Sequence, residues 1–118
     1  EQHQAYERLL LQVLAASRLE RLVHARALSD RWLTQPEIVR STLRAWLSCW
    51  RDVLLVQLGL ADSSGREAAA SVASRLGAVA TREAAASVQQ ALADLDTNVN
   101  PRLVLDLLVL AFPRATLA

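Results

Sequence analysis

The chain has 118 residues, of which 53% are hydrophobic, and it contains only three glycines and three prolines. This composition predicts one ordered, helix-rich domain and excludes a disordered chain. The formal net charge of +1 excludes a strong electrostatic attraction to nucleic acid or to an anionic membrane surface. The single cysteine, Cys49, excludes an intrachain disulfide and gives no sign of secretion.

The chain begins with Glu1 and contains no methionine, so we expect it to be a piece of a longer protein. Residues 1–118 are expected to form a single domain of that protein. No apolar run approaches the roughly 18 residues of a membrane span, and no charged leader precedes an apolar segment. We therefore expect a cytoplasmic protein with no membrane partner.

Two amphipathic helices are expected in the first third of the chain, over residues 3–16 and 18–33. Ser17 and Glu20 form an S-x-x-E capping box, which predicts that a new helix starts here. In the second helix Arg26 and Asp30 interrupt the apolar face, which indicates partial exposure to solvent or to a partner. The inward-facing candidates of this helix are Leu19, Leu22, Val23 and Ala27.

A long third helix is expected to begin at a second capping box, Thr34 with Glu37, and to end at Gly59 in a left-handed conformation. Its apolar stripe contains Trp46 and Trp50, one helical turn apart. Tryptophans in such a stripe indicate a core more often than a cofactor site, and each buried indole N–H needs an acceptor. The whole inner face comprises Val39, Leu43, Trp46, Leu47, Trp50, Leu54 and Leu58.

Two alanine-rich helices are expected next, over residues 66–76 with Ser64 as the cap and over residues 82–96 with Thr81 as the cap. Both contain the heptapeptide REAAASV, and we expect their small side chains to pack closely against each other.

The last helix is expected within residues 98–113, NVNPRLVLDLLVLAFP. Asn100 suits the N-terminal cap, Pro101 suits the first turn, and Pro113 cannot continue a helix. Because the helix is apolar on nearly every side, we expect it to be the central element of the bundle. Its one charge, Asp106, is expected either to pair with Arg102 or to face a neighbouring subunit.

No segment alternates between apolar and polar residues as a strand does, so the expected fold is all-α, a single compact bundle of about five to six helices. No cluster of His, Cys, Asp or Glu at metal-ligand spacing and no nucleophile motif occurs, so we expect no catalytic, metal or cofactor site. One alternative is a helical nucleic-acid-binding module, although acidic residues are interleaved with its arginines. Those arginines are Arg18, Arg21, Arg31, Arg40, Arg44 and Arg51.

Residues 32–113 resemble the C-terminal helical domain of bacterial DNA polymerase III clamp-loader subunits, the delta prime subunit in particular. WLSCWRDVLLVQLG, at residues 46–59, looks like that family's long helix with spaced tryptophans, Trp-Arg-Asp and a Leu-rich end. Residues 98–113 are similar to its terminal helix with Asn-x-Asn followed by a Leu-rich run. Asp106 departs from the pattern, since members more often carry Glu there. The equivalent domain of the gamma/tau subunit is related.

The resemblance implies a role in DNA replication through assembly of subunits. In that family an AAA+ module with a zinc-binding insert precedes the helical domain, and five helical domains form a closed collar. The assembled loader places the sliding clamp on primed DNA. The implied partners are the delta and gamma/tau subunits in the bacterial cytoplasm, with DNA contacted only indirectly. Candidate interface or packing residues are Arg26, Trp32, Trp46, Trp50, Arg51 and Asp106, the core being favoured for Trp46 and Trp50.

Overall fold

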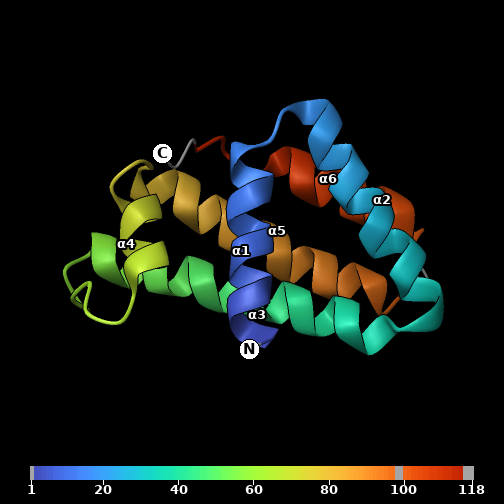
Figure 1. Cartoon of the computed structure of the whole chain (residues 1–118), viewed down its shortest axis with the longest axis horizontal. Coiled ribbons are helices and arrows are strands. Elements are labelled where there is room, and N and C mark those ends of the chain that lie inside the picture. The colour runs from blue at the N-terminus through green and yellow to red at the C-terminus, as the bar shows by residue number, and fades with distance from the viewer. Residues whose placement is uncertain (1, 98–99, 116–118) are drawn as a thin grey trace.

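The computed structural model describes residues 2–97 and 100–115, and within these ranges it contains six helices and no strand. This confirms the expected all-α bundle (Figure 1). The helices are α1 (Gln2–Ala15), α2 (Arg18–Thr34), α3 (Pro36–Gln57), α4 (Glu67–Ala73), α5 (Ala78–Leu95) and α6 (Pro101–Ala111). None of these six helices is long and apolar enough to cross a membrane.

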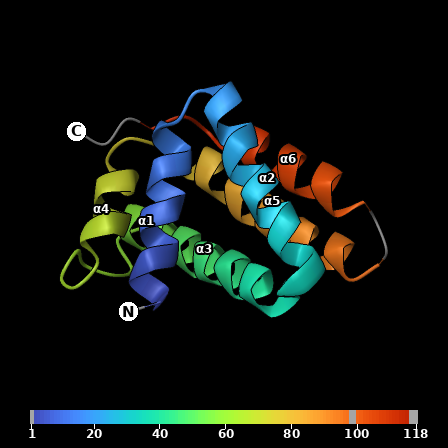
Figure 2. The ribbon, with the colours of Figure 1, turned by 45° about the vertical axis from the view of Figure 1, so that its right-hand side comes forward.

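The central helix is α3, not the last helix as the sequence predicted. α3 packs against α1, α2, α4 and α5, whereas α6 packs mainly against α2 and α5. Figures 1 and 2 show α1 crossing α3, with α4 at one end of α3 and the α2–α6 pair beside the other. α6 also has a solvent-facing side, since Leu103 and Leu107 are 52% and 59% exposed. The core therefore buries only some of the apolar side chains of α6.

The core forms around the predicted inner face of α3. Val39, Leu43, Trp46 and Trp50 of this face are fully buried, and all six helices contribute to the same apolar cluster. Burial of such a stripe is the main source of stability for a bundle of short helices. Leu58 departs from the prediction, because it lies past the end of α3 and is exposed.

Three predicted helix ends are confirmed. Ser17 Oγ accepts a hydrogen bond from the Glu20 N–H at 3.2 Å, and Glu20 Oε1 accepts one from the Ser17 N–H at 2.9 Å. Asn100 Oδ1 accepts from the second and third amides of α6, and Pro101 occupies the first helical position. Gly59 ends the α3 region with φ 73°, a conformation that favours glycine. Asn98, where the last helical segment was expected to begin, lies outside the described residues.

The predicted cap at Thr34 is wrong. Thr34 is the last residue of α2, and the helical conformation is interrupted at the next residue, Gln35, which has φ −138° and ψ 61°. The break falls at Gln35 because Pro36 disfavours helical geometry in the residue before it. No side chain caps the start of α3.

The predicted caps at Ser64 and Thr81 are also wrong. The Ser64 N–H donates to Asp62 Oδ1 at 3.0 Å in a tight turn, and Gly65 then takes φ 72°, so α4 starts only at Glu67. α5 starts a turn earlier than predicted, and Thr81 lies inside it with its hydroxyl donating to the Gly77 carbonyl. The two REAAASV segments do not form their own unit, because α4 and α5 each pack mainly on α3.

The inward face of α2 was assigned to the wrong side. Leu19 and Val23 are 74% and 65% exposed, whereas Arg21, Ala25 and Leu28 are buried. These three residues have the i, i+4, i+7 spacing of one helical face, and the first of them, Arg21, is charged.

Candidate functional site

The first candidates for a functional site are the side chains that can coordinate an ion or act as a nucleophile. Within residues 2–97 and 100–115, no three His, Cys, Asp or Glu side chains gather into a group that could hold a metal ion. Cys49 is buried, and its burial raises the pKa of the thiol to about 12. Its thiolate is therefore scarce at neutral pH.

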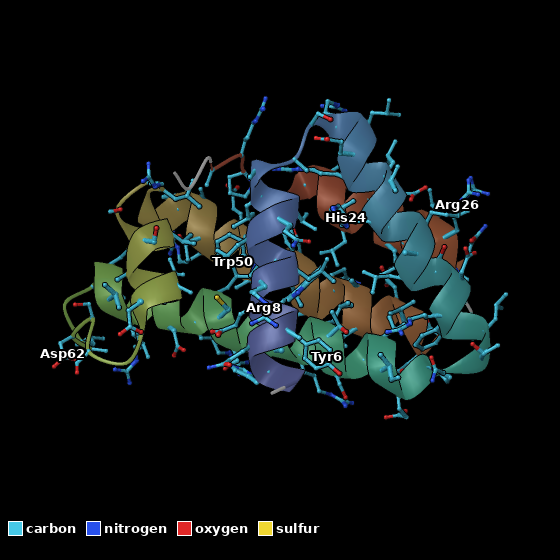
Figure 3. The ribbon with its side chains drawn as sticks, viewed as in Figure 1. Tyr6, Arg8, His24, Arg26, Trp50 and Asp62 are labelled. Atoms are coloured by element: carbon cyan, nitrogen blue, oxygen red, sulfur yellow. The ribbon has the colours of Figure 1, made fainter. Side chains whose placement is uncertain are left out.

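An aromatic junction joins α3 to the end of α6. The ring of Phe112 lies 5.8 Å from that of Trp46 and 5.6 Å from that of Trp50, in edge-on and tilted arrangements that aromatic pairs favour. Trp46 Nε1 donates to the Tyr6 carbonyl at 3.0 Å, as a buried indole requires. Trp50 Nε1 is buried without a hydrogen-bond partner among the described residues. Figure 3 shows Trp50 inside the bundle, so both tryptophans are core residues rather than surface anchors.

Arg21 was predicted to belong to a basic surface, and this prediction is wrong. Its side chain is buried, and Nη1 donates to the carbonyls of Val109 at 2.9 Å and Phe112 at 2.6 Å. Nη2 donates to the carbonyls of Leu14 at 3.1 Å and Pro113 at 3.0 Å. Burial lowers the pKa of Arg21, and the nearby charges of Arg114 and Arg18 lower it further. The guanidinium thus satisfies free carbonyls at the ends of α1 and α6, where a positive charge is favoured.

Trp32 and Arg40 form a second internal contact. The Arg40 guanidinium lies over the Trp32 ring at 4.7 Å and donates to Asp96 at 3.0 Å and to Glu37. The hydrogen bond to Asp96 is the main reason why the pKa of Arg40 is raised. This group links α2, α3 and the end of α5. Two of the six arginines proposed for a basic surface, Arg21 and Arg40, are therefore engaged within the molecule.

The remaining candidates are Arg26, Arg51 and Asp106. Arg26 and Arg51 are exposed, on α2 and α3, and Figure 3 shows Arg26 pointing away from the bundle. Asp106 is half-buried and, although both residues are described, it forms no ion pair with Arg102 within 4.0 Å. Of the two alternatives predicted for Asp106, pairing with Arg102 is therefore wrong, and a contact with a neighbouring subunit stays a prediction. The structure thus brings Arg26 and Asp106 into one hollow but leaves the tryptophans elsewhere.

One exposed surface combines apolar and charged residues, and we name it the α2–α6 face. Its apolar members are Leu19 and Val23 on α2 and Leu103 and Leu107 on α6. One hollow lies between α2 and α6, and a second, of about 300 Å³, lies between α5 and α6. The first is lined by Leu19, Leu22, Val23, Arg26, Arg102 and Asp106. The second is lined by Ser87, Gln90, Ala91, Asp94, Leu103, Val104, Leu107, Leu108 and Ala111. Each hollow therefore has two exposed, large apolar side chains in its lining, Leu19 and Val23 in the first and Leu103 and Leu107 in the second.

Comparison of the chain with protein-family models, with curated proteins and with solved structures found no match.

Proposed function

We propose that this chain is the helical assembly domain of a bacterial DNA polymerase III clamp-loader subunit of the delta prime type. Its role would be to hold neighbouring subunits in order while the loader places the sliding clamp on DNA. Catalysis and cofactor binding are assigned to other parts of the loader, and contact with DNA is indirect.

The observation that carries this proposal is the aromatic junction. The two segments that resemble the family, residues 46–59 and 98–113, are separated by about 40 residues, yet Trp46 and Trp50 of the first contact Phe112 of the second. A resemblance confined to surface residues would have no such mutual packing. The two segments therefore pack together in one core through Phe112, which follows the last residue of α6, as expected for a single assembly domain.

The α2–α6 face supports an assembly role by its composition. Exposed leucine and valine side chains lose contact with water when a partner covers them, which favours association. The arginines and carboxylates around them supply the polar rim that gives such an interface its orientation.

The test is a binding experiment with the loader subunits of the same bacterium. The chain is mixed with the delta subunit and with the gamma/tau subunit at micromolar concentration and analysed by size-exclusion chromatography with light scattering. A complex with either subunit is expected. No complex with either of them, alone or together, would contradict the proposal. The related domain of the gamma/tau subunit remains the alternative assignment.

A further inference from the structure

We propose that α1 and the strap, residues 112–115, open and close together as a lid over Trp46 and Trp50, and that Arg21 holds this lid shut. The proposal concerns a motion within one chain, so it goes beyond the assembly role and does not depend on it.

The strap ties the end of α6 to the end of α1. It leaves α6 in an extended conformation, since Phe112 has φ −66° and ψ 142°. The Ala115 N–H then donates to the Leu14 carbonyl, in the last turn of α1, at 3.0 Å. Phe112 and Ala115 are each only 4% exposed, so the strap is packed into the bundle. Movement of the strap therefore removes a hydrogen bond from α1.

Arg21 binds both parts of the lid at once. Its Nη2 donates to the Leu14 carbonyl on α1 at 3.1 Å and to the Pro113 carbonyl on the strap at 3.0 Å. The Leu14 carbonyl thus accepts two hydrogen bonds, one from Arg21 and one from Ala115. Interactions that share a partner are coupled, and a buried charge is costly without its acceptors. Opening of one part therefore favours opening of the other.

α1 and the strap also meet at the tryptophans. Trp46 Nε1 donates to the Tyr6 carbonyl of α1 at 3.0 Å. The ring of Phe112 lies 5.8 Å from the Trp46 ring and 5.6 Å from the Trp50 ring. Opening of the lid therefore removes the acceptor of Trp46 and the aromatic neighbour of both indoles.

α1 is attached to the rest of the bundle in a way that allows it to open alone. It packs mainly on α3 and only slightly on α2, and Figures 1 and 2 show it lying across α3. Only Ala16 and Ser17 join it to α2. The other helices hold each other chiefly through the α2–α6, α3–α5 and α3–α4 contacts, which the lid does not supply. Elements with few packing partners are those that open below global unfolding. The fully buried Leu10, Val13 and Leu14 keep α1 closed most of the time.

The test is native-state hydrogen exchange of the whole chain, followed at individual amides by NMR. The protection factors of Leu10, in the middle of α1, and of Ala115 should agree within about threefold, because both amides exchange through the same opening. Both should lie about a hundredfold or more below those of Trp50 and Val53 in α3, which exchange only when the whole bundle unfolds.

Two substitutions far from α1 in the sequence test the coupling. Phe112→Leu should lower the protection of Leu10 and Ala115 together by about fivefold, because the strap loses its aromatic contacts. Arg21→Lys should lower both by about tenfold, since an ammonium lacks the planar fork that reaches α1 and the strap at once. Circular dichroism checks that each variant remains helical.

Val39→Ala is the matched control. Val39 is fully buried in the first turn of α3, two turns before Trp46, so its packing is kept when the lid opens. It should lower the protection of Trp50 and Val53 by more than about tenfold but leave Leu10 and Ala115 unchanged.

Three results would overturn the proposal. The first is a Leu10 protection factor as high as those in α3. The second is a Phe112→Leu variant that changes Ala115 and leaves Leu10 unaltered. The third is a Val39→Ala variant that lowers the protection of the lid as much as that of α3. None of these outcomes bears on binding to the delta or gamma/tau subunits, which is measured with those partners.

Discussion

The guanidinium of Arg21 donates a 2.6 Å hydrogen bond to the main-chain carbonyl of Phe112, 91 residues away in the sequence. The same side chain also donates to carbonyls of Val109, Pro113 and Leu14. A buried charge without a carboxylate is tolerated here because its neighbours are several oriented carbonyl dipoles. Arg21 therefore joins α2 to the ends of α1 and α6.

Replacing Arg21 with methionine should destabilise the protein by about 3 kcal/mol, because the apolar volume is kept while the buried carbonyls lose their donors. Arg21→Lys should lose less, since an ammonium retains the charge but not the planar fork. Urea unfolding followed by circular dichroism measures both. Arg44→Met, on the exposed side of α3, is the control and should change stability by less than about 0.5 kcal/mol. A loss below about 1 kcal/mol for Arg21→Met would show that water replaces the guanidinium.

Truncating Phe112 should open a cavity between Trp46 and Trp50, whose rings it contacts at 5.8 and 5.6 Å. Phe112→Ala is expected to cost about 3–4 kcal/mol, and Phe112→Leu about 1 kcal/mol, because leucine refills part of the space. Guanidinium unfolding followed by circular dichroism gives both values. Equal losses for the two variants would mean that the aromatic contacts, rather than the volume, stabilise this junction.

The helix caps allow a comparison between two serines. Ser17→Ala should cost about 1 kcal/mol, because the Glu20 amide loses its acceptor, whereas Ser64→Ala should cost less than about 0.5 kcal/mol. Ser64 offers only its backbone N–H to Asp62 and caps no helix. Thermal unfolding of both variants provides the measurement. A loss for Ser64→Ala as large as that for Ser17→Ala would count against this assignment of caps.

The sequence predicted the positions that depend on local chemistry better than those that depend on distant partners. The inner face of α3, the Ser17 box and the Asn100 cap follow from residues within one or two turns. Arg21 did not, because its partners at Val109, Phe112 and Pro113 become neighbours only when α6 docks on α2. Most arginines lie at the surface. Arg21 is buried instead because the free carbonyls at the end of α6 accept its hydrogen bonds.

The outward side of α6 was missed for a related reason. A helix that is apolar on nearly every side is expected to be central. Here the central helix is α3, whose Trp46 and Trp50 rings are fully buried. Pattern alone does not show which of two strongly apolar helices is surrounded. Of the candidate surface residues, Arg26 and Asp106 lie together, whereas Trp46 and Trp50 are buried.

Glu20 should make stability depend on acid pH. Its pKa is lowered, chiefly by the hydrogen bond from the Ser17 backbone, so folding favours the ionised form. The resulting stabilisation is complete above the ordinary value of 4.5 and is lost as the pH falls through the lower folded-state pKa. Glu20→Gln retains a cap but does not titrate. Its melting temperature should therefore lie below that of the original chain at pH 7, and the difference should shrink toward pH 3. A constant difference across this range would remove Glu20 from the acid response.

Cys49 should resist thiol reagents until the protein unfolds. With its pKa raised to about 12 by burial, the thiolate fraction at pH 8 is about 10⁻⁴, roughly a thousandfold lower than for an ordinary thiol. Because the chain has one cysteine, the reaction with Ellman's reagent reports on this position alone. Labelling should be at least a hundredfold slower in buffer than in 8 M urea. Similar rates in both would mean that α3 opens readily.

The Ala115 N–H donates to the Leu14 carbonyl at 3.0 Å, next to the bonds from Arg21. These bonds join segments that leave the ribosome about 100 residues apart, several seconds at ordinary rates of synthesis. Until α6 and the residues after it emerge, the carbonyls and apolar side chains that await them are exposed. The contacts that tie α1 to the segment after α6 can therefore form only late in translation, and until then the nascent domain leaves apolar surface open to chaperones and to aggregation.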